Sequence, residues 1–278
     1  MAGIQIQNVS VDYPVEGGGA RRILNGINLE IGAGEFISIV GQTGCGKSTL
    51  LRLILAEELP TGGQILVNGK IRSQPDRTCG YVPQRYSLFP DKTVLANITL
   101  GLEVCEFGPF GLLNPARPKR MREFRAEALR YLKRTGLTEA DGRKYPHQLS
   151  GGMQQRVAIA QALILKPPVL LMDEAFSALD PGTRAGMQRL IKELWRESGT
   201  TIIFVTHNTR EALCLGTRVV ALAKHPSGER GASVALDLSV PHIDFDSGDE
   251  EMRALTREVE SATLPVGEPR EETASVYN

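Results

Sequence analysis

The stretch GQTGCGKST, residues 41–49, decides what kind of chain this is. The apolar run FISIV, residues 36–40, precedes it and predicts a buried strand, and LLRLIL, residues 50–55, follows it and predicts a helix. Glycines let a turn come close to a polyphosphate, and the start of the helix offers N–H groups to an anion. This order of strand, glycine-rich turn and helix predicts a nucleotide-binding P-loop.

Two side chains of this loop carry the expected chemistry. Lys47 supplies a positive charge worth about 4 kcal/mol when it lies about 4 Å from a phosphate oxygen in surroundings of effective dielectric about 20. Ser48 offers its hydroxyl to Mg²⁺. A chance match is the alternative, expected in about one protein in a hundred. The other candidate ATP-binding residues of the loop are Gly41, Gln42, Thr43, Gly44, Cys45, Gly46 and Thr49.

Composition narrows the class of protein. The 278 residues include 32 Lys and Arg and 32 Asp and Glu, so there is no basic excess for nucleic acid as a main partner. Four scattered cysteines without CxxC spacing indicate a reduced compartment and no structural zinc. The start MAGIQIQ lacks a signal-peptide pattern, and no apolar run has the length of a membrane span. We therefore expect a soluble chain unless another subunit holds it at a membrane.

Predicted strands alternate with helices, which indicates an α/β fold whose sheet is mostly parallel with an antiparallel part, and which binds nucleotide at the carboxyl ends of its parallel strands. Strand 4–11 is expected at an edge or in a hairpin, a helix spans about 48–59, and Trp195 is assigned to the core. The other strands are expected at 27–31, 36–40, 64–67, 79–82, 169–172, 201–206 and 218–223.

The region 93–166 differs, because its apolar residues recur at helical spacing. This predicts a helical subdomain, 92–156, inserted into a nucleotide-binding core made of 1–91 and 157–240. Residues 241–278 form an acidic tail with a short helix near 252–259 and a disordered end.

Three further patterns carry chemistry. VLLMDE, residues 169–174, has the form of a Walker B strand, in which Asp173 holds Mg²⁺ through water and Glu174 acts as general base; a helix cap is the alternative. LSGGMQQ, residues 149–155, opens a helix at Ser150, where capping and anion binding are both possible. FVTH ends a buried strand with His207, a second catalytic candidate.

Over about residues 4–223, these motifs together resemble the ATP-binding cassette (ABC) ATPases, the motor subunits of ABC transporters. The resemblance implies that Tyr13 stacks on adenine, that Gln84 of YVPQ binds Mg²⁺ and couples to a membrane subunit, and that His207 lies near the γ-phosphate. It also assigns Asp180 of SALD to the dimer interface. The signature residues that bind the partner protomer's ATP are Ser150, Gly151, Gly152 and Gln154.

The resemblance also implies ATP and Mg²⁺ as cofactors and a head-to-tail dimer with a second copy of the chain. Integral-membrane permease subunits, and through them a solute-binding protein, are the other expected partners. The location implied is peripheral, on the cytoplasmic face of the inner membrane.

Within the family, YPHQ (145–148), the Thr183-Arg184 pair and VTHN-x-x-EAL (205–213) resemble bacterial importers of nitrate, sulfonates and taurine. DEAFSALD (173–180) is also similar to glycine-betaine importers, and Ala175 departs from the commoner proline. Urea-like solutes, an exporter subunit and a non-transport ABC ATPase remain alternatives. A small P-loop kinase is contradicted by LSGG.

Overall fold

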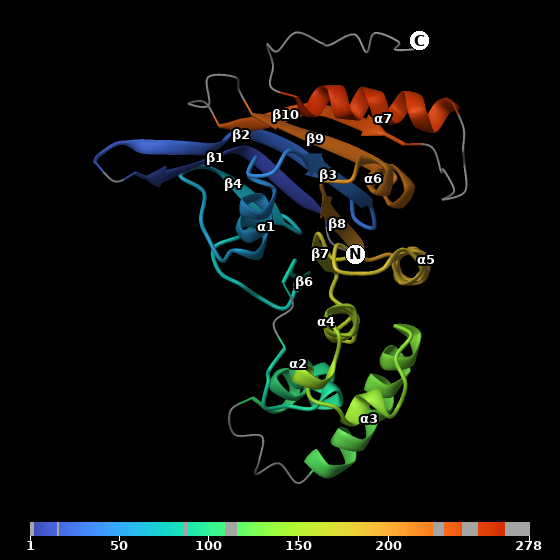
Figure 1. The fold of residues 1–278 in the computed structure, drawn as a ribbon. Coiled ribbons are helices and arrows are strands. Elements are labelled where there is room, and N and C mark those ends of the chain that lie inside the picture. The colour runs from blue at the N-terminus through green and yellow to red at the C-terminus, as the bar shows by residue number, and fades with distance from the viewer. Residues whose placement is uncertain are drawn as a thin grey trace. The chain divides into compact units, whose positions relative to one another are not determined.

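The computed structural model describes residues 3–15, 17–85, 88–108, 116–224, 231–240 and 250–264. The chain forms two compact units, drawn in Figure 1. Unit 1 comprises Asp76–Ile202, and unit 2 comprises Gly3–Pro75 with Ile203–Asn278. The expected helical subdomain lies inside unit 1, which also contains two strands and a further helix.

Unit 2 contains most of the sheet, and its strands are both parallel and antiparallel. β1 pairs antiparallel with β2 and β4, β9 pairs antiparallel with β10, and β3 runs parallel to β9. Their order in the sheet is β5 (Lys70–Ile71), β4 (Gly62–Val67), β1 (Ile4–Pro14), β2 (Ala20–Ile31), β10 (Ala232–Ser239), β9 (Arg218–Lys224) and β3 (Phe36–Gly41).

Of the two placements expected for the first strand, the hairpin is confirmed, because β1 pairs antiparallel with β2, and the edge position is wrong. β1 has a partner on each side, because the register of Ile4 with Ile31 on β2 is matched by its register with Val67 on β4. Its alternating apolar residues are buried on one face of the sheet, as Ile4 and Ile6 show. Alternation reports a half-buried strand, and it does not tell an edge strand from an interior one.

Two turns that follow the P-loop depend on left-handed backbone. The helix α1 (Lys47–Leu55) is shorter than predicted, because Ala56 adopts φ 59° and its N–H closes the helix on the Arg52 and Leu53 carbonyls. After β4, Asn68 and Gly69 have φ of 53° and 71°, which confirms the predicted tight turn.

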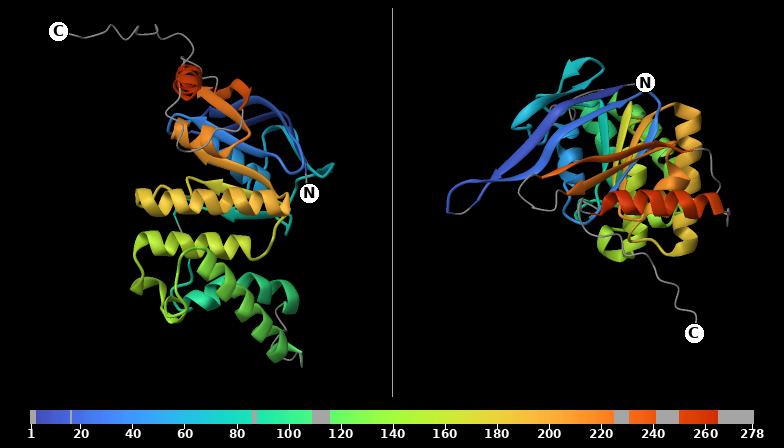
Figure 2. Two further views of the ribbon diagram at one scale, coloured as in Figure 1. Left: turned by 90° about the vertical axis from the view of Figure 1, so that its right-hand side faces the viewer. Right: turned by 90° about the horizontal axis from the view of Figure 1, so that it is seen from above.

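The C-terminal part of unit 2 includes a helix that the sequence predicted and a strand that it did not. β10 was missed, and α7 (Glu250–Thr263) confirms and extends the helix expected near 252–259. Figures 1 and 2 show α7 alongside β9 and β10. Met252 and Val259, two helical turns apart, are buried in one cluster with residues of α6 (Thr209–Leu215). Residues 250–264 therefore pack in the core of unit 2, although the charges of α7 face solvent.

Unit 1 pairs two parallel strands with a group of helices. β6 (Cys79–Val82) runs parallel to β7 (Val169–Asp173). The helices α2 (Val94–Phe107), α3 (Arg117–Arg134) and α4 (Gly151–Leu163) share one buried cluster, which confirms the helical spacing of the sequence. The remaining elements are η2 (Asp141–Arg143), η3 (Pro146–Gln148), α5 (Pro181–Ser198) and β8 (Thr201–Thr206). The boundary between the two units falls within β8, after Ile202.

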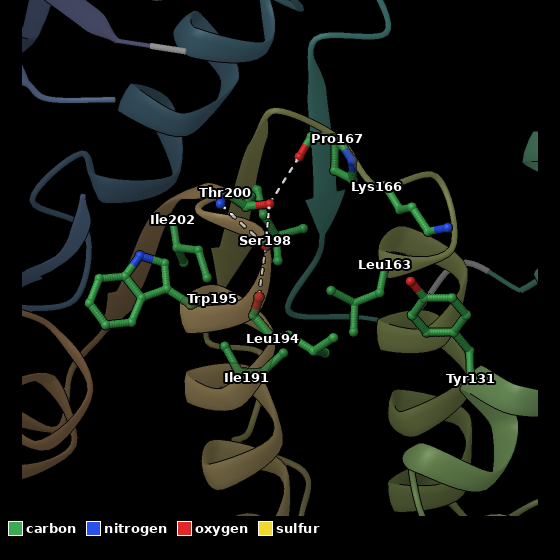
Figure 3. A pocket seen from close by; sticks show the side chains of 11 residues that line it. Tyr131, Leu163, Lys166, Pro167, Ile191, Leu194, Trp195, Ser198, Thr200 and Ile202 are labelled. Atoms are coloured by element: carbon green, nitrogen blue, oxygen red, sulfur yellow. Dashed lines mark hydrogen bonds between the residues drawn. The ribbon is translucent and has the colours of Figure 1, made fainter. Parts of the chain in front are cut away.

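Trp195 does not lie in the core as predicted. It is half-buried on the last turn of α5, whereas Met187 and Ile191 of the same helix are buried. Figure 3 shows its ring on the wall of an apolar cavity of about 50 Å³, which Tyr131 and Lys166 also line. Among the described helices, none combines the length and apolarity needed to cross a membrane.

Candidate functional site

The P-loop connects β3 to α1 and is fastened by its own lysine. Lys47 is 6% exposed, and its ammonium donates to the carbonyl oxygens of Gly41 at 2.6 Å and Gln42 at 3.0 Å. The lysine therefore closes the loop over its own start. In the loop, Gln42, Thr43, Gly44 and Ser48 are exposed, whereas Gly41, Cys45, Gly46, Lys47 and Thr49 are buried.

Close approach requires glycine at both ends of the loop. A Cβ on Gly41 would lie 2.5 Å from the Leu222 carbonyl oxygen and 2.7 Å from Cys45 Sγ. Gly46 has φ 98°, and a Cβ there would lie 2.6 Å from Leu24 Cδ2. A larger residue at position 41 would therefore press on the backbone of β9. At position 46 the positive φ is the constraint, because the atom approached there belongs to the Leu24 side chain.

The first turn of α1 is open to an anion. Gly46 is its N-cap, no described side chain caps the helix, and no acidic residue stands in the first turn. Its N–H groups and the positive end of the helix dipole are therefore available to phosphate. Lys224, at the end of β9, places a second cation here, with Nζ 3.5 Å from the Thr43 carbonyl oxygen. Sequence reasoning missed Lys224, because 181 residues separate it from Thr43.

Cys45 is a buried thiol beneath this loop. Burial raises the pKa of the Cys45 thiol above its usual value, and the nearby Lys47 charge only partly offsets that rise. The thiolate is the form that reacts with alkylating agents.

We therefore expect iodoacetamide to modify Cys45 much more slowly than the partly exposed Cys105 at about pH 7.5, with the gap narrowing above about pH 9. Timed alkylation with peptide mass spectrometry measures both rates in one sample. Equal rates at the lower pH would contradict a protected, protonated thiol.

Tyr13, the predicted adenine-stacking residue, is held at the end of β1 by contacts to α1 and the segment after it. Its hydroxyl donates a short hydrogen bond to Glu58 and accepts one from Arg52 Nη2 at 3.3 Å. The ring itself is half-buried. Tyr13 and the P-loop belong to the same unit, as does His207, which is exposed just after β8.

Unit 1 brings together three of the residues predicted for hydrolysis. Asp173, the last residue of β7, is 4% exposed, and Glu174 follows it half-buried. Gln84, just beyond β6, donates from Nε2 to Glu174 Oε2 at 2.8 Å. Glu174 has φ 45°, a left-handed conformation that costs on the order of 1–3 kcal/mol in a residue other than glycine. Such strain is typical of residues whose side chain must point in one direction.

The signature segment forms the start of α4. Ser150 Oγ accepts from the Met153 N–H at 3.3 Å, so the predicted N-cap is confirmed. Gln154 donates to the Leu149 carbonyl at 3.2 Å. Ser150 is exposed, Gly151 and Gly152 are half-exposed, and no acidic residue occupies the first turn. The turn can thus present N–H groups to an anion outside this unit.

Asp180 and His207 each stand at the start of a helix. Asp180 Oδ1 caps α5 by accepting from the Thr183 N–H at 3.0 Å, and this backbone N–H lowers the pKa of Asp180. After His207, Asn208 caps α6 by accepting from the Glu211 N–H at 3.0 Å. Both residues are exposed.

The oxygen donors predicted for Mg²⁺ suit a hard cation. A serine hydroxyl, an aspartate and a glutamine amide are the ligands that Mg²⁺ takes beside phosphate. They are divided between the units, with Ser48 in unit 2 and Asp173 and Gln84 in unit 1. Within the described residues there is no group of three or more His, Cys, Asp or Glu that could hold a metal by itself.

Comparison with known proteins agrees with this geometry. The family model described as ABC transporter matches residues 24–177, from β2 through the Walker B motif. A bicarbonate transport ATP-binding protein of Synechococcus elongatus is 39% identical over 87% of this chain, which covers 35% of that protein. The chain therefore spans about a third of the length of that relative.

Two further similarities cover their counterparts almost fully. An aliphatic sulfonates import ATP-binding protein of Pseudomonas fluorescens is 37% identical over 90% of this chain and 85% of its own length. The ATP-binding cassette MJ0796, solved as a dimer in a post-hydrolysis state bound to ADP and Pi, superposes with a TM-score of 0.73. That pair is 33% identical over 86% of this chain and the whole of the other.

Proposed function

The chain belongs to the ABC transporter family, and we propose that it is the ATP-hydrolysing subunit of a bacterial importer of a small solute. The observation that carries this proposal is the set of phosphate-binding features at the P-loop of unit 2. There an uncapped helix start, the exposed Ser48 and the buried Lys47 converge on one glycine-rich loop. Tyr13 of the same unit would take the adenine ring.

Hydrolysis is assigned to the residues at the end of β7. Glu174 would accept a proton from the attacking water as general base. Gln84 holds one carboxylate oxygen of Glu174, so the hydrogen bond at 2.8 Å orients the base. When bound, Mg²⁺ would neutralise charge that develops on the phosphates. Ser48, Asp173 and Gln84 would hold it, and His207 would contact the γ-phosphate.

A second copy of the chain would complete the site. The exposed start of α4 supplies Ser150, Gly151, Gly152 and Gln154 to the ATP of the partner protomer, and Asp180 lies at the interface. The dimeric state of the cassette MJ0796 supports this arrangement. A head-to-tail dimer of two-fold symmetry makes two such sites at once.

Permease subunits would dock on the helical part of unit 1. A groove of about 470 Å³ lies between α2 and α3, and its wall includes Ala96 and Thr99 of α2 and Arg122 and Arg125 of α3. Phe89, which is 47% exposed, lies between Gln84 and the start of α2 in the chain. The lining sets Arg122, Arg125 and Arg143 against the single carboxylate of Glu103, and this excess of positive charge would favour a short helix with an acidic side chain.

We expect Ala96→Arg to prevent assembly with the permease while leaving the ATPase rate of the isolated subunit within about twofold. The long arginine side chain would fill the groove and exclude a partner helix by its bulk. Co-purification with the tagged permease measures assembly, and Ala254→Arg, on the exposed face of α7, is the matched control. Normal assembly of Ala96→Arg would remove this surface from the proposal.

The transported solute is inferred from relatives alone. The names of the relatives refer to bicarbonate and to aliphatic sulfonates, both small oxyanions, and the importer motifs at 145–148 and 205–213 agree with that group. Urea-like solutes and an exporter role are the alternatives. No nucleic-acid partner is proposed, and the chain would sit at the cytoplasmic face of the inner membrane only through its permease.

One experiment tests the whole proposal. Tagged Glu174→Gln subunit is expressed in its native cell, the membranes are solubilised mildly with ATP present, and the co-purifying proteins are identified. A multi-span permease with a solute-binding protein would support import. Soluble partners or nucleic acid without a permease would mean that the chain uses ATP for something other than transport.

A further inference from the structure

A line of polar contacts joins the P-loop to Tyr13 through α1. Arg52 Nη2 lies 3.3 Å from Thr49 Oγ1, the last residue of the loop motif, and 3.3 Å from the Tyr13 hydroxyl. Arg52 Nε also lies 3.2 Å from Glu58 Oε1, while the other carboxylate oxygen of Glu58 accepts from the Tyr13 hydroxyl. All four residues belong to unit 2.

This line exists because α1 ends early. Thr49 and Arg52 are three residues apart and share one face of the helix. The left-handed Ala56 then ends α1, and Glu58, beyond that turn, meets both Arg52 and the Tyr13 hydroxyl. A helix that continued to residue 59, as the sequence predicted, would have placed Glu58 on a different face from Arg52.

We propose that Glu58, supported by Arg52, is a positioning residue that fixes the Tyr13 ring and thereby sets the affinity of the site for the nucleobase. This inference rests on the proposed function, in which Tyr13 stacks on adenine. Glu58 itself touches no nucleotide in this proposal. It acts only through the phenol hydroxyl.

The physical reason lies in the freedom of the ring. A half-exposed tyrosine held only at its Cα can take several rotamers, and a ligand that needs one of them must restrict the others. The bonds at the hydroxyl hold the far end of the ring before ligand arrives. Burial and then the hydrogen bond to Glu58 raise the pKa of Tyr13, so the phenol stays protonated and remains a donor at neutral pH.

The test is a double-mutant cycle on Tyr13→Phe and Glu58→Ala, with two probes. ATP reports on base and phosphate together, and inorganic tripolyphosphate reports on the phosphate end alone. We expect each single variant to weaken ATP binding about five- to tenfold, the effect of losing one ordinary hydrogen bond. The double variant should be no weaker than either single one, because both changes break the same contact.

Tripolyphosphate affinity should stay within about twofold in all variants, which a general loss of folding would not allow. Glu57→Ala removes a neighbouring exposed carboxylate and should change neither probe. The proposal is overturned if Glu58→Ala weakens ATP binding as much in the Tyr13→Phe background as in the wild type, or if it weakens tripolyphosphate equally. Failure of the wild-type chain to bind either probe would instead overturn the proposed function.

Discussion

Glu174→Gln is expected to bind ATP normally, to lose hydrolysis by about 10²- to 10⁴-fold, and to accumulate as a dimer when ATP is present. The magnitude is that of a general base, since the amide cannot accept the proton of water. Binding should persist, because the phosphate end of the site lies on the loop and helix of unit 2. Release of inorganic phosphate measures turnover, and size-exclusion chromatography with and without ATP measures the dimer.

The substitution is mild enough to isolate the chemistry. Glutamine has the shape of glutamate and can still accept the Gln84 N–H through its own carbonyl oxygen, so the contact at 2.8 Å can survive. Glu193→Gln, on the exposed side of α5, removes the same charge away from the site and should keep full activity. Turnover by Glu174→Gln at near the wild-type rate would exclude Glu174 as the base.

The sequence predicts an element of the fold well when the residues that define it all lie within that element. β6 and β8 match their predicted limits, because each is a short run bounded by turn or breaker residues. The sequence did not predict β10. From the buried Ala232 onward every second residue of this strand is more covered than its neighbours, but Asp237 and two serines interrupt its apolar character, so the run did not look like a strand. The early end of α1 could not be predicted from the sequence either. Alanine favours helix, and Ala56 takes its left-handed conformation only in the folded context.

The residues of the candidate site show the same contrast between local and long-range signals. Residues in motifs were found because their spacing is local, as in the loop that contains Lys47 and the strand that ends in Asp173. Lys224 and Glu58 escaped notice because each meets its partner across a long stretch of sequence, 181 residues for Lys224 and Thr43 and 45 for Tyr13 and Glu58. Side chains that support a motif from a distance leave no periodic signal in one sequence.

Lys47→Ala is expected to weaken ATP binding by at least about 100-fold. A single charge about 4 Å from a phosphate oxygen, at an effective dielectric of about 20, contributes about 4 kcal/mol, which corresponds to about 10³ in affinity before desolvation is subtracted. The lysine is 6% exposed, so its charge is poorly screened by water. Isothermal titration with ATP measures the loss, and tripolyphosphate should lose affinity in parallel because the contact is to phosphate.

The effect also has a structural part that must be separated from the electrostatic one. Without the ammonium, the carbonyl oxygens of Gly41 and Gln42 lose a shared donor, at 2.6 Å and 3.0 Å, and the loop can open. Lys47→Arg keeps the charge but places it on a bulkier group, so it should restore part of the loop's thermal stability without restoring full ATP affinity. Lys224→Ala, which removes a cation with only a 3.5 Å contact to Thr43, should cost far less affinity than Lys47→Ala. Unchanged ATP binding by Lys47→Ala would contradict the phosphate role of the loop, because Lys224, the second cation beside the loop, is expected to contribute far less.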